Sequence, residues 1–331
     1  MADYGVVIGV SYPAGGPFTQ LQGTKNDADA FFNWLQDAGG GDVPVANIEV
    51  VGLSPPRANT TKSDIENAFE DLVIRARRGD ERQGRLFIYA SGHGFSSGQF
   101  TFETGLVTSD CTDAHWRNVA LSKYADFFVM SGMFDSVILL LDCCRGRTTT
   151  YPIAELAAGT LKGQTRAKPP AKVQGHACHW GVLAKEHKFG DEYRGYFSKA
   201  LEEAFNHMPG DLNGNITPQR LNDFVAELIE SWQDPARQVP VPVIEGTFGT
   251  PVVLGKARAL PKQVTLEFAP RFIGQRATIQ FDGQGLADEQ FAIPATPVVV
   301  ELKCGNYKVE VEGLGVSVSF MVPINQHIHV E

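Results

Sequence analysis

The sequence has few cysteines for its length. Five occur among its 331 residues, an odd and sparse number that does not suit the disulfide framework of a small secreted domain. The chain also lacks an apolar run of the roughly 18 residues that a membrane helix needs. Its first ten residues, MADYGVVIGV, carry no basic leader, and their apolar run is too short for a signal peptide. These absences predict a soluble protein with reduced thiols, located in the cytoplasm and not in a membrane.

Positive charge is also scarce. The formal net charge is −9, and no basic patch is interleaved with aromatic residues, so the sequence argues against a general nucleic-acid-binding protein. Hydrophobic residues make up 43% of the chain and charged residues 20%. These values are typical of a globular protein with a core of its own.

Apolar strands and amphipathic helices alternate along the first part of the sequence. Thr61 is a plausible helix N-cap with Asp64 three residues later, and Pro218 stands near the first position of another helix. Unbroken apolar strands joined by such helices predict a three-layer α/β domain with a mostly parallel sheet. The predicted strands are YGVVIGV (4–10), NIEVVGL (47–53), GRLFIYAS (84–91), DSVILLLD (135–142) and KVQGHACHWGVLA (172–184). The predicted helices lie within 23–40, 61–80, 122–131, 194–205 and 217–232.

The pattern changes to period two after about residue 255. The segments VTLEF, ATIQF, YKVEV and VSVSF alternate apolar and polar residues and are separated by turn signals. We therefore predict an α/β domain over 1–257 and a small all-β sandwich over 258–331. His327 and His329 alternate with apolar residues and should lie on the outer face of the last strand. The β domain is expected to bind or regulate, for example through a regulatory protein, although a purely structural role is nearly as well supported.

Two predicted strands end in reactive side chains. His93 follows the third strand, in YASGHGF, and Cys144 follows the fourth, in LLLDCCRGR. Because the carboxyl ends of parallel strands meet at one edge of a sheet, the two side chains should lie close together. An imidazole beside a thiol can take its proton, and the thiolate then attacks a carbonyl. Gly94, which has no Cβ, lets its N–H approach the resulting oxyanion together with the N–H of Cys144.

These motifs resemble those of the caspase–metacaspase family of cysteine peptidases. Cys144-Arg145-Gly146 fits the end of the caspase cysteine signature, which has its histidine about 50 residues upstream. The segments LQGTKNDADAF, YASGHG and GYFSKAL also look like segments of that family. The resemblance covers roughly residues 4–254 and implies a Cys-His dyad. In the family pattern D-x-C the nucleophile is the third position, which is Cys144. A simpler interpretation is that Cys143 and Cys144 only fill space.

The resemblance also implies a specificity. Metacaspases, which cleave after Arg or Lys, carry an aspartate at the positions matched here by Asp27 and Asp142. Two carboxylates in one pocket attract a cation and repel an acid. Alternatively, Asp27 is only a first-turn acid or cap of its helix, and Asp142 forms a local salt bridge with Arg145 or Arg147. The expected protein is a cysteine endopeptidase acting on peptides or proteins with a basic P1 residue. A catalytically silent scaffold that uses its β domain is the alternative, and a peptidyl ligase is a third interpretation.

The loop over 147–172 is long, basic and poorly patterned. We predict self-processing there, with Arg166 as the first choice and Lys162 as the second. The competing interpretation is an intact chain whose basic loop is simply solvated.

No cofactor is expected from the sequence. HACH (176–179) suggests zinc, but a strand would place His176 and Cys178 on one face and His179 on the other. Many metacaspases bind calcium through an acid-rich region after the histidine motif. The matching segment GFSSGQFTFETG has Glu103 as its single acid, so the sequence does not support calcium.

Overall fold

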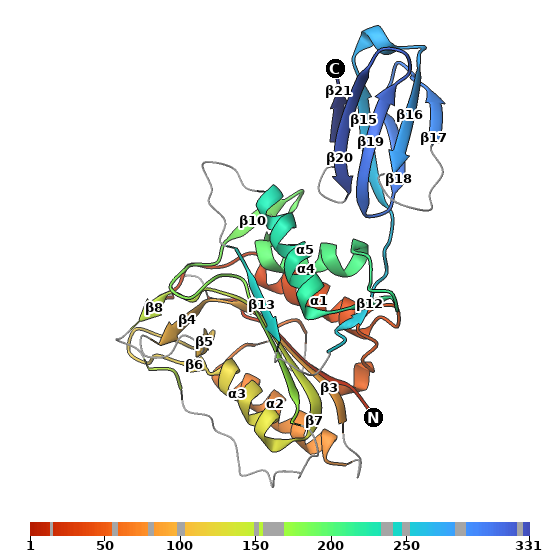
Figure 1. The fold of residues 1–331 in the computed structure, drawn as a ribbon. Helices are drawn as coiled ribbons and strands as arrows, with labels where there is room; N and C mark the ends of the chain where they lie inside the picture. Colours follow the sequence, from red (N-terminus) through yellow and green to blue (C-terminus); the bar gives the residue numbers. More distant parts are fainter. Residues whose placement is uncertain are drawn as a thin grey trace. The chain divides into compact units, whose positions relative to one another are not determined.

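The structure is a computed structural model with two compact units. It describes residues 1–13, 16–54, 59–78, 83–97, 103–148, 152–154, 169–232, 241–246, 252–281, 289–322 and 327–331. One unit comprises Met1–Glu202 with Asn215–Lys256, and the other comprises Glu203–Gly214 with Ala257–Glu331 (Figure 1). A hydrophobic core lies within each unit.

A six-stranded sheet forms the centre of the first unit. In spatial order its strands are β13 (Val243–Gly246), β9 (Ala171–His176), β7 (Phe134–Cys143), β3 (Gln83–Gly92), β1 (Tyr4–Gly9) and β2 (Ile48–Val51). All neighbours run parallel except β13, which is antiparallel to β9. The central strands are almost entirely buried, as expected for a parallel sheet covered on both faces. The predicted three-layer α/β fold is therefore confirmed.

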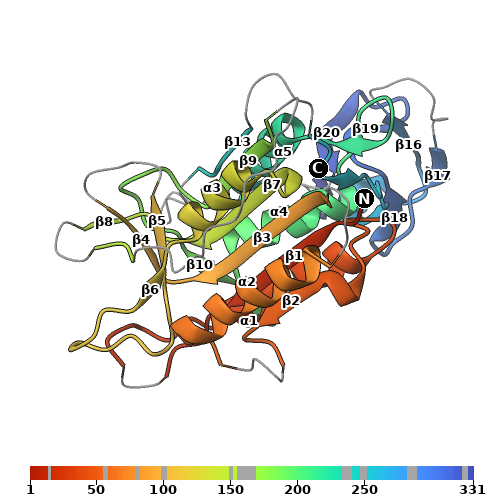
Figure 2. The same cartoon turned by 90° about the horizontal axis from the view of Figure 1, so that it is seen from below.

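Helices cover both faces of this sheet. Their bounds are α1 (Thr24–Gln36), α2 (Lys62–Ala76), α3 (Leu121–Ser131), α4 (Tyr196–His207) and α5 (Pro218–Ser231), with short 3₁₀ helices at Val45–Asn47 and Pro270–Phe272. Helices α2 and α3 bury their apolar sides on one face of the sheet, and α1, α4 and α5 lie over the other (Figures 1 and 2). On that second face, Phe31 of α1 stacks on Tyr89 of β3 with ring centroids 4.4 Å apart.

Two helix starts confirm sequence predictions. The Thr61 side chain accepts a hydrogen bond from the Asp64 N–H, and the Asp64 carboxylate accepts one from the Thr61 N–H. This reciprocal capping box satisfies two N–H groups that the helix itself leaves unpaired. Pro218 begins α5, where its missing N–H costs nothing.

Several short strands near the carboxyl edge of the sheet were not predicted. Four of them form a separate sheet, in the order β6 (Asn118–Val119), β5 (Thr104–Val107), β4 (Gly94–Ser97) and β8 (Arg147–Thr148). A hairpin of β10 (Glu186–Phe189) and β11 (Glu192–Gly195) and a pair of β12 (Asn215–Ile216) and β14 (Gly255–Lys256) complete the unit. Strands of two to four residues show too little alternation to be recognised from sequence.

The second unit contains two β-sheets around one core. One sheet has the order β18 (Val298–Leu302), β15 (Lys262–Phe268) and β21 (His327–Val330), and the other has β17 (Glu289–Ala292), β16 (Arg276–Phe281), β19 (Gly305–Val311) and β20 (Val316–Val322). Apolar residues of both sheets, such as Val264 and Val309, share the core. The predicted all-β sandwich is confirmed, with its period-two burial visible in β19 and β21.

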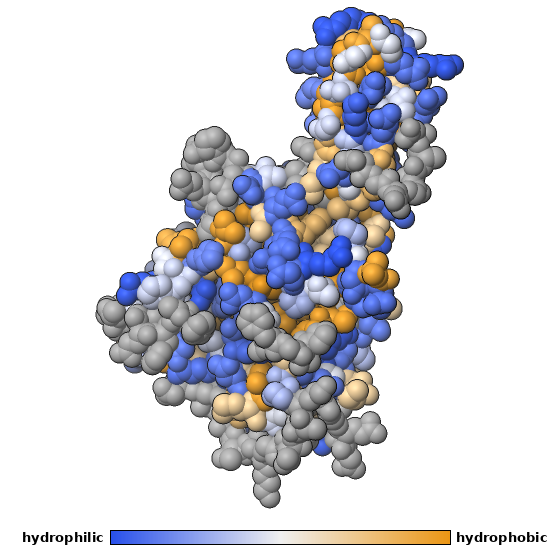
Figure 3. All heavy atoms as spheres, in the orientation of Figure 1, coloured by the Kyte–Doolittle hydropathy of each residue, from blue (hydrophilic) through white to orange (hydrophobic). Residues whose placement is uncertain are grey.

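Hydrophilic side chains cover much of the face shown in Figure 3, with hydrophobic ones between them. Exposed large hydrophobic side chains such as Val45, Met130 and Leu212 are far apart in the sequence, and such isolated residues are normal at protein surfaces. Across the described ranges, no helix combines the length and the apolar character that crossing a membrane requires.

Candidate active site

Strand pairing brings His93 and Cys144 to one edge of the sheet. Gly92, the last residue of β3, is paired with Cys143, the last residue of β7. His93 and Cys144 are the next residues after these two neighbouring strands. Both line a cavity of about 90 Å³, which Asp27 and Asp142 also line. The structure thus brings together the four side chains that the sequence singled out for catalysis and substrate binding.

A backbone carbonyl fixes the orientation of His93. The ring Nε2 lies 2.7 Å from the carbonyl oxygen of Thr19. A carbonyl can only accept a hydrogen bond, so Nε2 carries the proton and Nδ1 of the neutral ring is left as the proton acceptor. This contact leaves Nδ1 as the ring nitrogen that can accept a hydrogen bond.

The backbone N–H of His93 is also fixed by a hydrogen bond. The His93 N–H donates to the Tyr12 hydroxyl at 2.7 Å, and that hydroxyl donates to the Val107 carbonyl at 2.9 Å. The Tyr12 ring lies 4.7 Å from the imidazole, centroid to centroid. Thr19 and Tyr12 were not predicted, because they lie in a segment without a motif and contact a residue far along the chain.

The two adjacent cysteines lie in different surroundings. Cys144 is half-buried, lines the cavity and donates its thiol to the Ala184 carbonyl at 3.7 Å. Burial raises the pKa of the Cys144 thiol, and the charge of Asp142 raises it further. The resting group is therefore a thiol that needs a base to become a nucleophile. Cys143 is only 2% exposed and belongs to the core.

Gly94 stands where a side chain would not fit. A Cβ there would lie 2.7 Å from the Cys143 sulfur and 2.8 Å from the Cys144 carbonyl oxygen. Glycine is needed for the start of β4 to pass this close to the end of β7. The oxyanion role of the Gly94 and Cys144 N–H groups stays a prediction.

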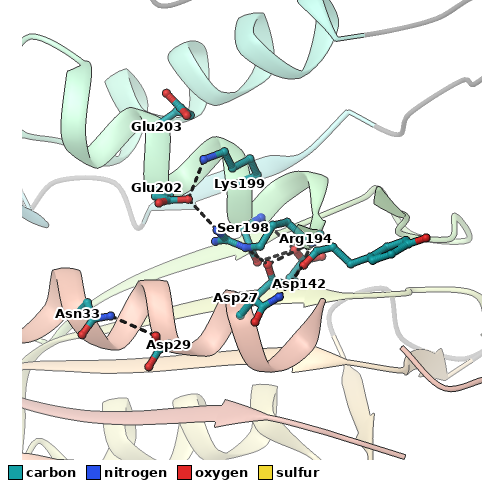
Figure 4. A network of polar contacts seen from close by, with 12 residues as sticks. Asp27, Asp29, Asn33, Asp142, Arg194, Ser198, Lys199, Glu202 and Glu203 are labelled. Atoms are coloured by element: carbon teal, nitrogen blue, oxygen red, sulfur yellow. Dashed lines mark hydrogen bonds and ion pairs between the residues drawn. The ribbon is translucent and has the colours of Figure 1, made fainter. Parts of the chain in front are cut away.

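Asp27 and Asp142 are buried and hydrogen-bonded from several elements (Figure 4). Asp27, in the first turn of α1, accepts from the Ser91 hydroxyl at 3.0 Å and from the Gly195 N–H at 3.0 Å. Asp142 accepts from the Ser198 N–H at 2.9 Å and from its hydroxyl at 2.5 Å. A Cβ on Gly195 would lie 2.0 Å from an Asp142 oxygen, so glycine there makes room for the carboxylate.

An internal arginine approaches this acid pair. The Arg194 Nε–H donates to Asp27 at 2.8 Å, and the other end of the guanidinium donates to Glu202 at 2.8 Å. Lys199 in turn lies 3.0 Å from Glu202 (Figure 4). Arg194 was not predicted, since the pairing of residues 27 and 194 has no local signal in the sequence.

The surroundings of the acid pair favour a bound proton by raising the pKa of both carboxyl groups. Burial raises the pKa of Asp27 to about 7, the Asp142 carboxylate adds to this effect, and Arg194 opposes it. Burial also raises the pKa of Asp142, against the hydrogen bonds from Ser198. Two carboxyl groups that share one buried site hold a proton more tightly than either would alone.

Glu186 is a third acid in the cavity lining, and the sequence analysis also missed it. Its carboxylate accepts hydrogen bonds from the N–H groups of Gln22 at 3.1 Å and Gly23 at 3.0 Å. These contacts tie the β10–β11 hairpin to the residues that lead into α1.

The other candidate residues that the structure describes are not among those that line this cavity. Arg166 and Lys162, the proposed processing sites, lie outside the described residues. His176 and Cys178 are buried and His179 is exposed, and burial lowers the pKa of His176 to about 3. Glu103, the single acid in the segment that matches the calcium-binding region of metacaspases, lies 3.9 Å from Lys123.

A family model matches most of the chain. Residues 3–244 match the Peptidase C14 family model, described as the caspase domain. Solved structures that the chain is similar to include caspase-1 of Spodoptera frugiperda, with 15% identity, a TM-score of 0.49 and coverage of 78% of this chain and 91% of that one. Another is protein GSU0716 of Geobacter sulfurreducens, with 11% identity, a TM-score of 0.45 and coverage of 75% and 93%. No curated protein gives a significant match.

Proposed function

Because the chain belongs to the caspase family of cysteine peptidases, we propose that it is a cysteine endopeptidase that cleaves peptide bonds after Arg or Lys. One observation carries the proposal. A thiol, an imidazole and a pair of carboxylates line the same cavity at the carboxyl edge of the sheet. Such an arrangement suits acyl transfer from a substrate that bears a cation.

The reaction begins with proton transfer from Cys144 to Nδ1 of His93. The thiolate attacks the scissile carbonyl carbon, and the carbonyl electron pair moves to oxygen. Collapse of this oxyanion breaks the C–N bond, and the imidazolium gives its proton to the leaving amine. Water, activated by the neutral imidazole, then hydrolyses the thioester and regenerates the Cys144 thiol. By binding Nε2–H, the Thr19 carbonyl keeps Nδ1 free to accept the proton in both steps.

Backbone groups and acids complete the proposed site. The N–H groups of Gly94 and Cys144 stabilise the oxyanion, since Gly94 lies just beyond the end of β3 and Cys144 just beyond the end of its neighbour β7. Asp27 and Asp142 bind the side chain of the P1 residue, whose positive charge pairs with the carboxylates. This reaction needs no metal or cofactor.

Three further parts of the proposal concern self-processing, location and the β unit. The loop over 147–172 is processed by the enzyme itself, at Arg166 first and Lys162 second. A cytoplasmic location is favoured by thiols such as Cys111, Cys143, Cys144 and Cys178, which are free. The β unit is assigned a binding or regulatory role, with a protein partner.

A fluorogenic peptide set varied at P1 tests the activity. The wild-type protein should hydrolyse peptides with P1 Arg or Lys and leave P1 Asp intact, and Cys144→Ala should be inactive. If both proteins are folded and neither hydrolyses any peptide, the result supports the alternative that the protein is a catalytically silent scaffold. Efficient cleavage after Asp would overturn the proposed specificity.

A further inference from the structure

Two histidines and a glutamate, residue types that often ligate metals, meet on the outer face of the second unit. Glu267 comes from β15, and His327 and His329 come from β21, which runs parallel to β15 with Glu267 opposite His329. In β21 the histidines are exposed and alternate with buried Ile328 and Val330. The two histidines were predicted to lie on this outer face, and the pairing of the strands adds the glutamate.

Both imidazoles approach the same carboxylate oxygen. His327 Nε2 lies 3.0 Å and His329 Nδ1 lies 3.3 Å from one oxygen of Glu267. The two rings stack with centroids 4.6 Å apart and an interplanar angle of 17°. One ligand atom from each residue falls within 4.8 Å of the others. A tetrahedral zinc ion with ligands at about 2.0–2.2 Å needs ligand atoms about 3.3 Å apart, so small side-chain rotations suffice.

Fold stability does not explain this cluster. The three side chains are 48–63% exposed, and exposed ion pairs contribute little to stability. Two stacked imidazolium ions would also repel each other. A single divalent ion can instead bind both neutral imidazoles and the carboxylate at once.

We propose that Glu267, His327 and His329 form a binding site for a divalent transition metal, with Zn²⁺ as the ion that this donor set suits best. Two imidazoles and one carboxylate are a frequent zinc ligand set that leaves a coordination position open. Here the ligand side chains project from an exposed face of the sheet, so the open coordination position is accessible to water or to a donor group of another molecule. The three residues belong to the second unit, whereas the residues that line the proposed catalytic cavity belong to the first.

Zinc titration calorimetry on the full chain tests the site. The titration uses the Cys144→Ala background, since the active-site thiol could itself bind zinc. One zinc ion should bind per chain, and Glu267→Gln and His329→Ala should each weaken it at least about tenfold. His115→Ala, which removes an exposed histidine of the other unit, is the matched control and should leave the affinity unchanged.

Cobalt absorption provides a second measurement. Co²⁺ on this site should give visible bands of nitrogen and oxygen ligation without the near-ultraviolet thiolate band, and His327→Ala should abolish them. Circular dichroism of each variant shows that it is folded. The proposal is overturned if the chain binds no zinc, or if the variants at Glu267, His327 and His329 bind it as well as the parent.

Discussion

Arg194 donates an Nε–H hydrogen bond to Asp27 over 2.8 Å, and both side chains are buried. The proposed pocket for a substrate cation thus already has a protein cation beside one of its two carboxylates. Asp142 is held by Ser198 instead. The pocket therefore balances two effects: burial keeps a proton on the acid pair, and Arg194 favours its release.

Replacing Arg194 should shift this balance. In Arg194→Met the pKa of Asp27 rises above its present value of about 7, because the opposing cation is absent. Binding of P1 Arg peptides should be weak at neutral pH and recover at higher pH. The measurement is the pH profile of KM, which a merely structural defect would not shift. Glu202→Gln, which keeps the hydrogen bond between Arg194 and Asp27, should leave the profile nearly unchanged.

The stability of Arg194→Met should also depend on pH. An acid with a raised folded-state pKa holds its proton more tightly when folded, so the free energy of unfolding declines as pH rises from the unfolded pKa toward the folded one. Leaving one member of a buried pair charged costs about 3–5 kcal/mol. Urea denaturation at acidic and neutral pH measures the free energy of unfolding at each pH. Adding Asp27→Asn should flatten the pH dependence, and a double variant that keeps it would contradict the assignment to Asp27.

The unaltered pocket should bind basic side chains better as pH rises. Below the pKa of Asp27, about 7, the acid pair holds a proton that a P1 arginine must displace. If binding displaces one proton, the affinity of Cys144→Ala for a P1 Arg peptide should increase about tenfold between about pH 6 and pH 8. Calorimetry on this inactive variant keeps the titration of the dyad out of the result. Asp27→Asn should bind the peptide more weakly with a flat profile over the same range.

The fold and the proximity of His93 and Cys144 were predictable because their signals are local. Apolar runs predicted the strands of the sheet. His93 and Cys144 each follow one of these runs, so they lie close together if the two strands are neighbours in the sheet. Thr19, Arg194 and Glu186 were not predictable, because each acts through a contact with a residue far away in the sequence. The same holds for Glu267, whose relation to His327 depends on the parallel pairing of β15 with β21.

Cys144→Ala should abolish hydrolysis, with kcat reduced by several orders of magnitude. Cys143→Ala should retain most of the activity, because Cys143 lies in the core and not in the cavity lining. Removing its buried sulfur should lower the free energy of unfolding by about 1 kcal/mol. Rates and denaturation curves of both variants provide the comparison. Labelling of Cys143 in place of Cys144 by an electrophilic peptide would show that the nucleophile was misassigned.

Asp142→Gln should strongly weaken cleavage after Arg. Removing one partner of a buried, charge-assisted hydrogen bond costs about 2–5 kcal/mol, which should reduce kcat/KM for P1 Arg peptides at least about tenfold. Glu186→Gln is the matched control, because the backbone N–H groups of Gln22 and Gly23 already engage its carboxylate. It should affect P1 selectivity far less. Equal reductions in both variants would mean that overall negative charge, and not Asp142, selects the substrate.

Self-processing is expected in the segment 147–172, whose two ends lie in β8 and β9. The segment contains five basic residues and one acid, and it starts three residues after the proposed nucleophile. Lys168 precedes Pro169, whose ring fits a scissile bond badly, and Arg147 is in strand β8. These considerations favour Arg166, followed by Lys162. Intact-mass analysis of the wild type should show a cut that is absent from Cys144→Ala and is blocked or moved in Arg166→Ala. Equal fragmentation of the wild type and Cys144→Ala would instead indicate cleavage by another protease.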